Sequence, residues 1–261
     1  MELKLGKSQF ANLIMKRTPY DLKSLAKIVE GSYSNGSNRI GYVKKETFSP
    51  STLGYQSGRC PRRWVMLFRG AEQEDIHEPR SVDNMITGTA AHERIQKNFH
   101  HANEFTLDIE WDLWVDDPPV HGFVDMIIRD FNGFDIVVEI KTTRTEAFVA
   151  RKHNNKGPDY QTLQLLLYMY FLDMRYGLLL YEDKNDHDKL LIPVEMTSEN
   201  RQKIEKVVEW MRTVRHAYED DKLPERPYRK NSKECKSCPL LKWCAEQPIG
   251  DIKLEPLEFD G

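Results

Sequence analysis

The sequence predicts an α/β protein, α+β in the stricter sense, with a central mixed sheet flanked by helices. Hydrophobic residues follow a helical repeat before residue 100 and after residue 160, whereas residues 104–142 alternate as strands do. The chain has 261 residues, 39% of them hydrophobic and 30% charged, which is the composition of a globular protein with a sizeable core.

The front of the chain is polar. Residues 1–46 include a Gly-, Ser- and Asn-rich stretch at 31–41, so we expect an N-terminal extension on a flexible linker. Ser49 followed by Pro50 is typical of a helix start, with serine at the N-cap and proline in the first turn.

Two further helices are expected before the strands, at Pro61 to Phe68 and at Thr87 to Phe99. In the second helix, His92, Ile95 and Phe99 fall on one stripe, at positions i, i+3 and i+7. That stripe should face the core.

Three strands follow, at Phe105 to Val115, His121 to Ile128 and Phe134 to Lys141. Asn132-Gly133 between the last two is a strong hairpin signal. We therefore expect a meander of antiparallel strands.

The rear of the chain returns to helices. One is expected at about Tyr160 to Tyr176 and an amphipathic one at Ser198 to Asp220, with short strands at Leu178 to Glu182 and Leu190 to Val194. Acidic residues dominate Asp251 to Asp260, which we expect to be a loose tail. The predicted organisation is an N-terminal extension and linker (1–46), one domain (47–245) and an acidic C-terminal tail (246–261).

Composition limits location and partners. No apolar run approaches the roughly 18 residues of a membrane helix, and the first ten residues lack the apolar core of a signal peptide, so we expect a cytoplasmic protein without membrane contact. The net charge of −3 argues against a uniformly basic surface for nucleic acid. Any anionic substrate must meet local basic clusters. These are Arg59, Arg62, Arg63 and Arg69; Arg144, Arg151, Lys152, His153 and Lys156; and Arg226, Arg229, Lys230, Lys233 and Lys236.

Chemistry concentrates on the second and third strands. Glu139 and Lys141 are two apart on a strand and share a face, and folding about Asn132-Gly133 brings Asp125 opposite them. Their neighbours are apolar, so the charges need compensation, and a divalent cation such as Mg²⁺ or Mn²⁺ supplies it. On these three residues alone, a surface ladder of charges remains an equal alternative.

Neighbouring helices offer further polar groups. His92 could complete a metal shell, although a lone histidine on an apolar stripe is more often part of the core. Gln164 and Tyr168 lie one turn apart on the following helix, where a partly buried polar stripe is the other interpretation.

Four cysteines stand at the two ends of the chain. Cys60 lies near the front, and Cys235, Cys238 and Cys244 form a C-x2-C-x5-C cluster. In a reducing cytosol such spacing indicates a metal site. A [4Fe-4S] cluster and zinc both accept four thiolates, and iron–sulfur is favoured because zinc usually draws its ligands in two close pairs.

The order His92, Gly122-x-x-Asp125, Glu139-x-Lys141, Gln164-x3-Tyr168, bracketed by the four cysteines, resembles the PD-(D/E)XK nuclease superfamily over residues 47–245. It is most similar to the RecB-like branch with an iron–sulfur cluster, which includes CRISPR-associated adaptation exonucleases and AddB-type nucleases. The resemblance implies that His92, Asp125, Glu139 and the backbone carbonyl of Ile140 hold Mg²⁺ or Mn²⁺. Lys141 would then orient water, and Gln164 and Tyr168 would position the substrate.

The expected function is a metal-dependent DNA nuclease, an exonuclease acting on ends or single strands, with the cysteines holding a [4Fe-4S] cluster. Arg62, Arg63 and Arg144 are expected to position the substrate. The alternatives are an inactive nucleic-acid-binding adaptor of the same fold and a structure-specific endonuclease. DNA is the expected partner, alongside recombination or CRISPR-adaptation proteins. The sequence leaves open the cleavage polarity, the oligomeric state and the pathway, phage replication included.

Overall fold

The computed structural model describes residues 21, 23–25, 27–28, 44–74, 79–101 and 104–260. The chain divides into two compact units, one of Met1–Gly41 and His77–Met85 and the other of Tyr42–Ile76 and Ile86–Gly261. The predicted extension at 1–46 falls almost wholly outside the described residues, so the division into extension, domain and tail stays a prediction. All contacts reported below lie within the second unit.

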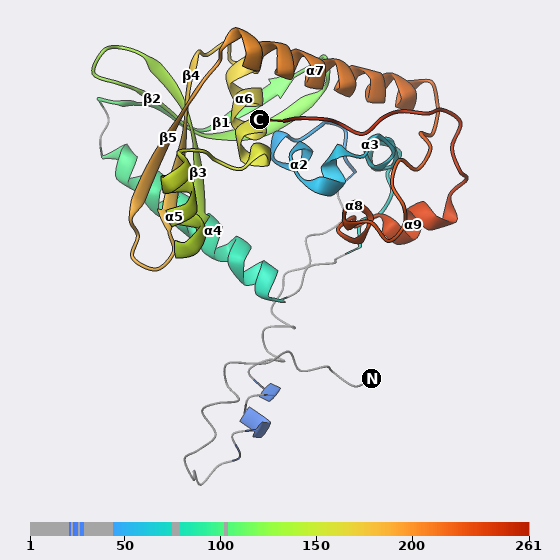
Figure 1. Cartoon of the computed structure of the whole chain (residues 1–261), viewed down its shortest axis with the longest axis horizontal. Coiled ribbons are helices and arrows are strands. Elements are labelled where there is room, and N and C mark those ends of the chain that lie inside the picture. Colours follow the sequence, from blue (N-terminus) through green and yellow to red (C-terminus); the bar gives the residue numbers. More distant parts are fainter. Residues whose placement is uncertain are drawn as a thin grey trace. The chain divides into compact units, whose positions relative to one another are not determined.

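Five strands form one mixed sheet in the order β1-β2-β3-β4-β5 (Figure 1). The strands are β1 (Thr106–Val115), β2 (Val120–Arg129), β3 (Asp135–Thr143), β4 (Tyr176–Asp183) and β5 (Lys189–Glu195). Every neighbouring pair is antiparallel except β3 and β4, which run parallel. A parallel pair needs a crossover connection, and α5 (Thr145–Asn154) and α6 (Asp159–Phe171) provide it. The predicted central mixed sheet flanked by helices is confirmed.

The remaining helices lie before and after the sheet in the chain. They are α2 (Pro50–Leu53), η2 (Gln56–Arg59), α3 (Pro61–Phe68), α4 (Pro79–His100), α7 (Ser198–Glu219), α8 (Lys233–Lys236) and α9 (Leu241–Glu246). The predicted helix start at Pro50 is correct, but the Ser49 side chain does not cap it; the Ser49 hydroxyl accepts a hydrogen bond from Lys45 Nζ at 3.0 Å instead. Within the described part of the chain, no helix is both long and apolar enough to cross a membrane.

The turn between β2 and β3 confirms the predicted hairpin. Asp130 Oδ1 accepts hydrogen bonds from the backbone N–H groups of Asn132 and Phe134, each at 2.9 Å. Gly133 has φ +84°, in the left-handed region that glycine adopts without strain. The local sequence therefore fixes the register of the two strands that carry the acidic residues.

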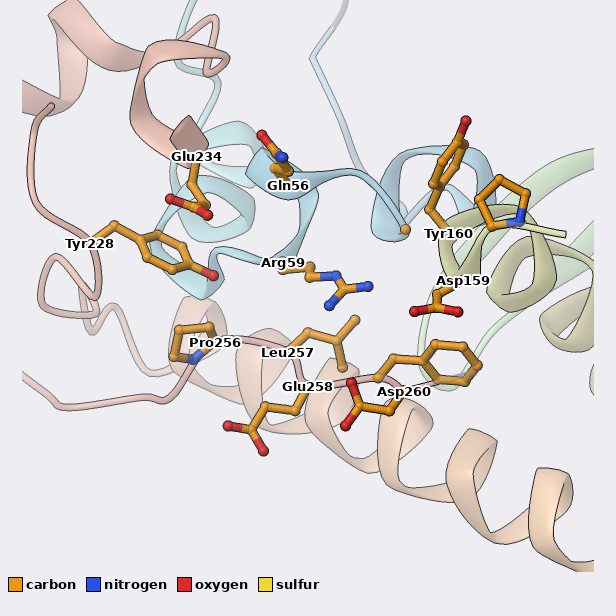
Figure 2. Close-up of a pocket in the computed structure, with 13 residues that line it drawn as sticks. Gln56, Arg59, Asp159, Tyr160, Tyr228, Glu234, Pro256, Leu257, Glu258 and Asp260 are labelled. Atoms are coloured by element: carbon orange, nitrogen blue, oxygen red, sulfur yellow. The ribbon is translucent and has the colours of Figure 1, made fainter. Parts of the chain in front are cut away.

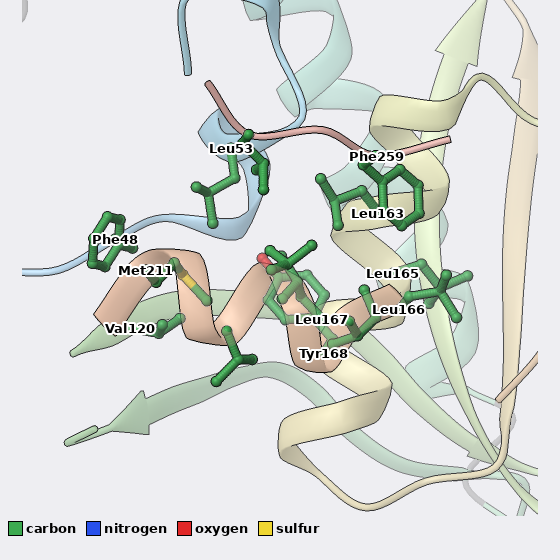
Figure 3. Packing of buried hydrophobic residues seen from close by; sticks show 14 of the residues in the cluster. Phe48, Leu53, Val120, Leu163, Leu165, Leu166, Leu167, Tyr168, Met211 and Phe259 are labelled. Atoms are coloured by element: carbon green, nitrogen blue, oxygen red, sulfur yellow. The ribbon is translucent and has the colours of Figure 1, made fainter. Parts of the chain in front are cut away.

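Hydrophobic side chains pack on both faces of the sheet. Figure 3 shows the larger cluster, in which Leu163 and Leu167 of α6 and Met211 of α7 are fully buried. On the opposite face, Ile95 and Phe99 of α4 pack against buried residues of β2, β3 and β4. The expectation that this stripe of α4 faces the core is confirmed.

The prediction of a loose C-terminal tail is wrong. Leu257 and Phe259 are each 4% exposed and belong to the larger hydrophobic cluster. The Leu257 N–H donates to the Arg59 carbonyl, and Trp210 Nε1 donates to the Glu255 carbonyl, both at 2.9 Å. The prediction considered only the acidic residues of this segment and overlooked that its apolar side chains can be buried.

Candidate functional site

The site lies where β2 and β3 separate. Their antiparallel ladder ends at the pair Met126↔Val138. Beyond it, the Asp125 carboxylate continues the connection, because its Oδ2 accepts a hydrogen bond from the Ile140 N–H at 2.6 Å. We call the residues gathered at this separation the acidic fork: Asp125, Glu139 and Lys141.

Within the acidic fork, the two charged groups of β3 contact each other. Lys141 Nζ donates to Glu139 Oε1 at 2.5 Å and to Gln164 Oε1 at 3.3 Å. Glu139 is 1% exposed, and its other oxygen, Oε2, has no hydrogen-bond partner among the described residues. The fork thus holds one buried acceptor that no described residue satisfies.

The protonation of the fork follows from burial and charge. Burial and the neighbouring Asp125 raise the pKa of Glu139 to about 7. Burial alone would lower the pKa of Lys141, but the charges of Glu139 and Asp125 outweigh it and raise that pKa. The ammonium therefore stays charged at neutral pH, while the pair of carboxylates carries negative charge that a cation would stabilise.

Two side chains of α4 reach Asp125. His92 Nδ1 lies 3.2 Å from Asp125 Oδ1. Burial would lower the pKa of His92, but the hydrogen bond and the charge of Asp125 raise it. One turn later, Gln96 Nε2 donates to the Asp125 carbonyl at 3.1 Å and to Glu110 Oε1 at 2.5 Å.

Glu110 adds a carboxylate that the sequence did not single out. The register pairs Ile109 with Met126 and Trp111 with Val124, which sets Glu110 opposite Asp125. Its φ of +57° is uncommon for a non-glycine residue, and it falls in the middle of a strand. Helical spacing from His92 could have identified Gln96, but nothing local identifies Glu110, because its place depends on the pairing of β1 with β2.

The predicted polar face of α6 does line the fork. Tyr168 is 2% exposed, and its pKa is raised by burial first and then by the charge of Glu139. A Cβ at position 122 would lie 3.0 Å from the Tyr168 hydroxyl, so Gly122 leaves room for it. The sequence missed Gln161, which lies one turn before Gln164 and accepts a hydrogen bond from the Tyr181 hydroxyl at 2.6 Å.

A cavity of about 880 Å³ is lined by other residues than the three of the acidic fork (Figure 2). Four acidic side chains and one arginine are among the residues that line it: Asp159, Glu234, Glu258, Asp260 and Arg59. Its Tyr160 ring packs against Tyr55, with ring centroids 4.9 Å apart, and the charges of Lys141 and Glu139 act on the Tyr55 hydroxyl. The acidic lining does not suit a phosphate, so we do not assign the substrate to this cavity.

Two of the three arginines expected to position substrate, Arg62 and Arg63, are buried in this structure. Arg62 is 1% exposed, and its guanidinium donates to the carbonyls of Pro224 (2.6 Å), Pro248 (2.6 Å) and Ile249 (2.9 Å) and to Cys244 Sγ (3.3 Å).

Arg63 is 8% exposed and donates to Ser57 Oγ at 3.4 Å. The prediction for Arg62 is corrected, because its buried guanidinium ties distant chain segments together. The Arg63 Nε is buried without a partner among the described residues, so a ligand-binding role for Arg63 stays a prediction. Arg144 is exposed at the N-terminus of α5 and remains a candidate.

The two ends of the chain meet at the cysteines, which we call the cysteine lobe: Cys60, Cys235, Cys238 and Cys244. All four thiols are free, and each of the other three acts electrostatically on Cys60. Burial, followed by the neighbouring thiols, raises the pKa of Cys60 to about 12. Cys60 therefore lies near the three C-terminal cysteines, as the sequence predicts. The proximity of the thiols does not identify a group that they would bind.

The fork offers oxygen donors to a metal, whereas the cysteine lobe offers sulfur donors. Among the described residues, no three His, Cys, Asp or Glu side chains converge closely enough to hold an ion. The donor chemistry nevertheless fits. The unpartnered Glu139 Oε2 is a hard oxygen donor of the kind Mg²⁺ and Mn²⁺ prefer. The four thiols near Arg62 and Arg63 are soft donors of the type that an iron–sulfur cluster or zinc accepts.

Known proteins resemble this chain in sequence and in fold. The sequence pattern of the PD-(D/E)XK nuclease superfamily matches residues 104–245, more than half of the chain. The CRISPR-associated exonuclease Cas4 of Saccharolobus solfataricus is 26% identical over 125 residues, which cover 47% of this chain and 58% of that protein. The chain thus spans little more than half the length of that relative.

One solved structure, an alkaline exonuclease from Laribacter hongkongensis, matches with a TM-score of 0.50 at 13% sequence identity. The match covers 67% of this chain and 90% of that one. At this level of identity the likeness concerns the fold.

Proposed function

Because this chain belongs to the PD-(D/E)XK nuclease superfamily, we propose that it is a metal-dependent deoxyribonuclease that acts as an exonuclease on DNA ends or single strands. The observation that carries the proposal is the acidic fork, in which Glu139 Oε2 is buried without a partner among the described residues, beside a charged lysine. A protein that only bound DNA would have no chemical use for that arrangement.

His92, Asp125, Glu139 and the carbonyl of Ile140 would hold Mg²⁺ or Mn²⁺. The bound cation would neutralise the phosphodiester and lower the pKa of a coordinated water. His92 and Ile140 already contact the Asp125 carboxylate through its two oxygens, at 3.2 Å and 2.6 Å, and so fix its orientation.

The other residues of the fork would act on the substrate and the attacking water. Lys141, held between Glu139 and Gln164, would orient the water and stabilise the negative charge that develops on the phosphate. Gln164 and Tyr168 on α6 would position the strand. Arg144, exposed one residue beyond the end of β3, would contact the strand from the other side of the fork.

Support for the exonuclease part of the proposal comes from the names of the similar proteins. The Saccharolobus solfataricus relative is named an exonuclease, and the structure with a similar fold is an alkaline exonuclease. The thiols of the cysteine lobe would hold a [4Fe-4S] cluster with a structural role, with zinc as the second candidate.

Lys141→Ala tests the proposed function. We expect it to lower cleavage of end-labelled DNA in Mn²⁺ or Mg²⁺ by about 100-fold or more, while folding and DNA binding remain. Lys206→Ala changes an exposed lysine on α7, outside the three basic clusters, and should cleave normally. Metal-dependent cleavage by Lys141→Ala at the wild-type rate would refute the assignment of the fork.

A further inference from the structure

We propose that Arg151 binds the phosphate next to the one that is cleaved, an inference that rests on the proposed function. Arg151 lies on α5, the helix that follows β3 directly. It was part of a basic cluster in the sequence, where nothing distinguished it from its neighbours. Its contacts in the structure set it apart.

The guanidinium of Arg151 is held on two sides. Its Cζ lies 4.7 Å from the centroid of the Tyr181 ring, and its Nη1 donates to Thr143 Oγ1. These two contacts do not use the donors on the edge of the guanidinium that carries Nε and Nη2. Nε is buried and has no hydrogen-bond partner among the described residues.

Arg151 also lacks a protein counter-charge. Across the described ranges, no carboxylate forms an ion pair with it, in contrast to Arg94, Arg129 and Arg175. A planar guanidinium that stacks on an aromatic ring keeps its in-plane donors available for a bidentate acceptor. The unsatisfied Nε therefore favours an anionic oxygen from outside the protein.

The position of Arg151 relative to the acidic fork identifies that anion. Thr143, which holds the guanidinium, lies two residues beyond Lys141 and shares its face of β3, because successive side chains alternate. Tyr181 lies beside Lys141 in the parallel register, and the charges of Lys141 and Glu139 act on its hydroxyl.

Thr143, whose hydroxyl accepts from Arg151 Nη1, therefore lies about 7 Å along the β3 backbone from Lys141. That is the scale of the separation between successive phosphates of a DNA strand. A strand whose scissile phosphate meets Lys141 would bring its neighbouring phosphate to Arg151. By contrast, Arg62 has its donors taken by three carbonyls and a thiol, so it has no such capacity.

The test uses single-stranded DNA in which one phosphate at a time is replaced by an uncharged methylphosphonate. Wild-type protein should lose about 10- to 100-fold in cleavage rate when the phosphate next to the cleaved one is neutral. Arg151→Gln should lose a similar factor on ordinary DNA but show no further loss on that modified strand. Arg151→Lys, which keeps the charge without the planar edge, should recover part of the rate.

Lys152→Gln is the matched control, since Lys152 is the exposed neighbour of Arg151 on α5. It should keep the wild-type sensitivity to the modified phosphate, and thermal unfolding should confirm that every variant is folded. A structural role for Arg151 would slow all substrates equally, so an Arg151→Gln protein that still discriminates against the modified strand overturns the inference. A wild-type protein that cleaves no DNA overturns the proposed function instead.

Discussion

The acidic fork and the cysteine lobe both place polar groups in hydrophobic surroundings, but they use them differently. In the fork, Glu139 Oε2 and the nearby Arg151 Nε have no partner among the described residues. In the lobe, the Arg62 guanidinium binds three backbone carbonyls and Cys244 Sγ, while the Nε of the adjacent Arg63 has no partner in the described part of the chain. Groups left unsatisfied mark a place for a ligand, whereas fully bonded groups hold the chain together.

The largest effect should come from removing one thiol of the cysteine lobe. We expect Cys60→Ala to lose bound iron and sulfide and to lower the free energy of unfolding by several kcal/mol, because a structural metal group contributes folding energy. Metal analysis of anaerobically purified protein and thermal unfolding measure the two effects.

Ser237→Ala, an exposed change between two of the cysteines, is the control. Hydrogen exchange should show loss of protection in the lobe while β2 and β3 stay protected. Wild-type iron content in Cys60→Ala would contradict the proposed role of the lobe. Zinc in place of iron would correct the identity of the group.

A smaller effect is expected for Arg62→Gln. The change leaves carbonyls of Pro224, Pro248 and Ile249 with fewer donors, and we expect a loss of about 3 kcal/mol in the free energy of unfolding. Cleavage per folded molecule should be unchanged. Denaturant unfolding and activity at matched folded concentration measure these quantities.

Arg229→Gln, an exposed arginine of the same region, should stay within about 0.5 kcal/mol of wild type. If Arg62→Gln had the wild-type free energy of unfolding but bound DNA more weakly, Arg62 would act on the substrate, as first expected, and would not have a structural role.

The smallest expected change in stability concerns Glu182, a buried carboxylate of β4 that binds Arg94 of α4. Glu182 is 1% exposed and accepts hydrogen bonds from Arg94 at 2.5 Å, Lys189 at 2.7 Å and His187 at 3.2 Å. Burial would raise the pKa of Glu182, but these bonds outweigh it and lower the pKa to about 2, from an ordinary value of 4.5.

A lowered pKa stabilises the folded state above the unfolded-state value, and this stabilisation is lost as pH falls from about 4.5 to about 2. The full shift corresponds to about 3.4 kcal/mol. Because glutamine keeps an acceptor oxygen for part of these bonds, Glu182→Gln should lower the free energy of unfolding at pH 7 by about 2 kcal/mol, and the difference should shrink towards pH 2. Denaturant unfolding across this pH range is the measurement. Glu195→Gln, which removes the exposed pair with Arg175, should change little, and an equal loss in both variants would refute the role given to Glu182.

Local sequence patterns predicted the fork well. Period-two alternation and the Asn132-Gly133 turn fix how β2 meets β3, so these patterns suffice to place Asp125, Glu139 and Lys141 together. The same holds for His92 on the core-facing stripe of α4, since helical periodicity extends over neighbouring turns.

Local patterns failed where distant segments meet. Arg62 and Arg144 look alike in the sequence, and only packing distinguishes a buried guanidinium from an exposed one. The C-terminal segment was expected to be loose because of its acidic residues. The sequence did not show that Leu257 and Phe259 pack into the larger hydrophobic cluster.

The sequence alone determined the mixed sheet, the acidic hairpin and the four cysteines as one group, because each depends on short-range periodicity or on unusual side-chain chemistry. The tertiary structure decided which polar groups are satisfied. Glu110 lies opposite Asp125 and its carboxylate accepts a hydrogen bond from Gln96, Arg62 is bonded, and the Arg151 Nε has no partner among the described residues. The physical reason is that hydrogen bonding of a buried group depends on which remote backbone and side-chain atoms pack against it, and no local pattern encodes that packing.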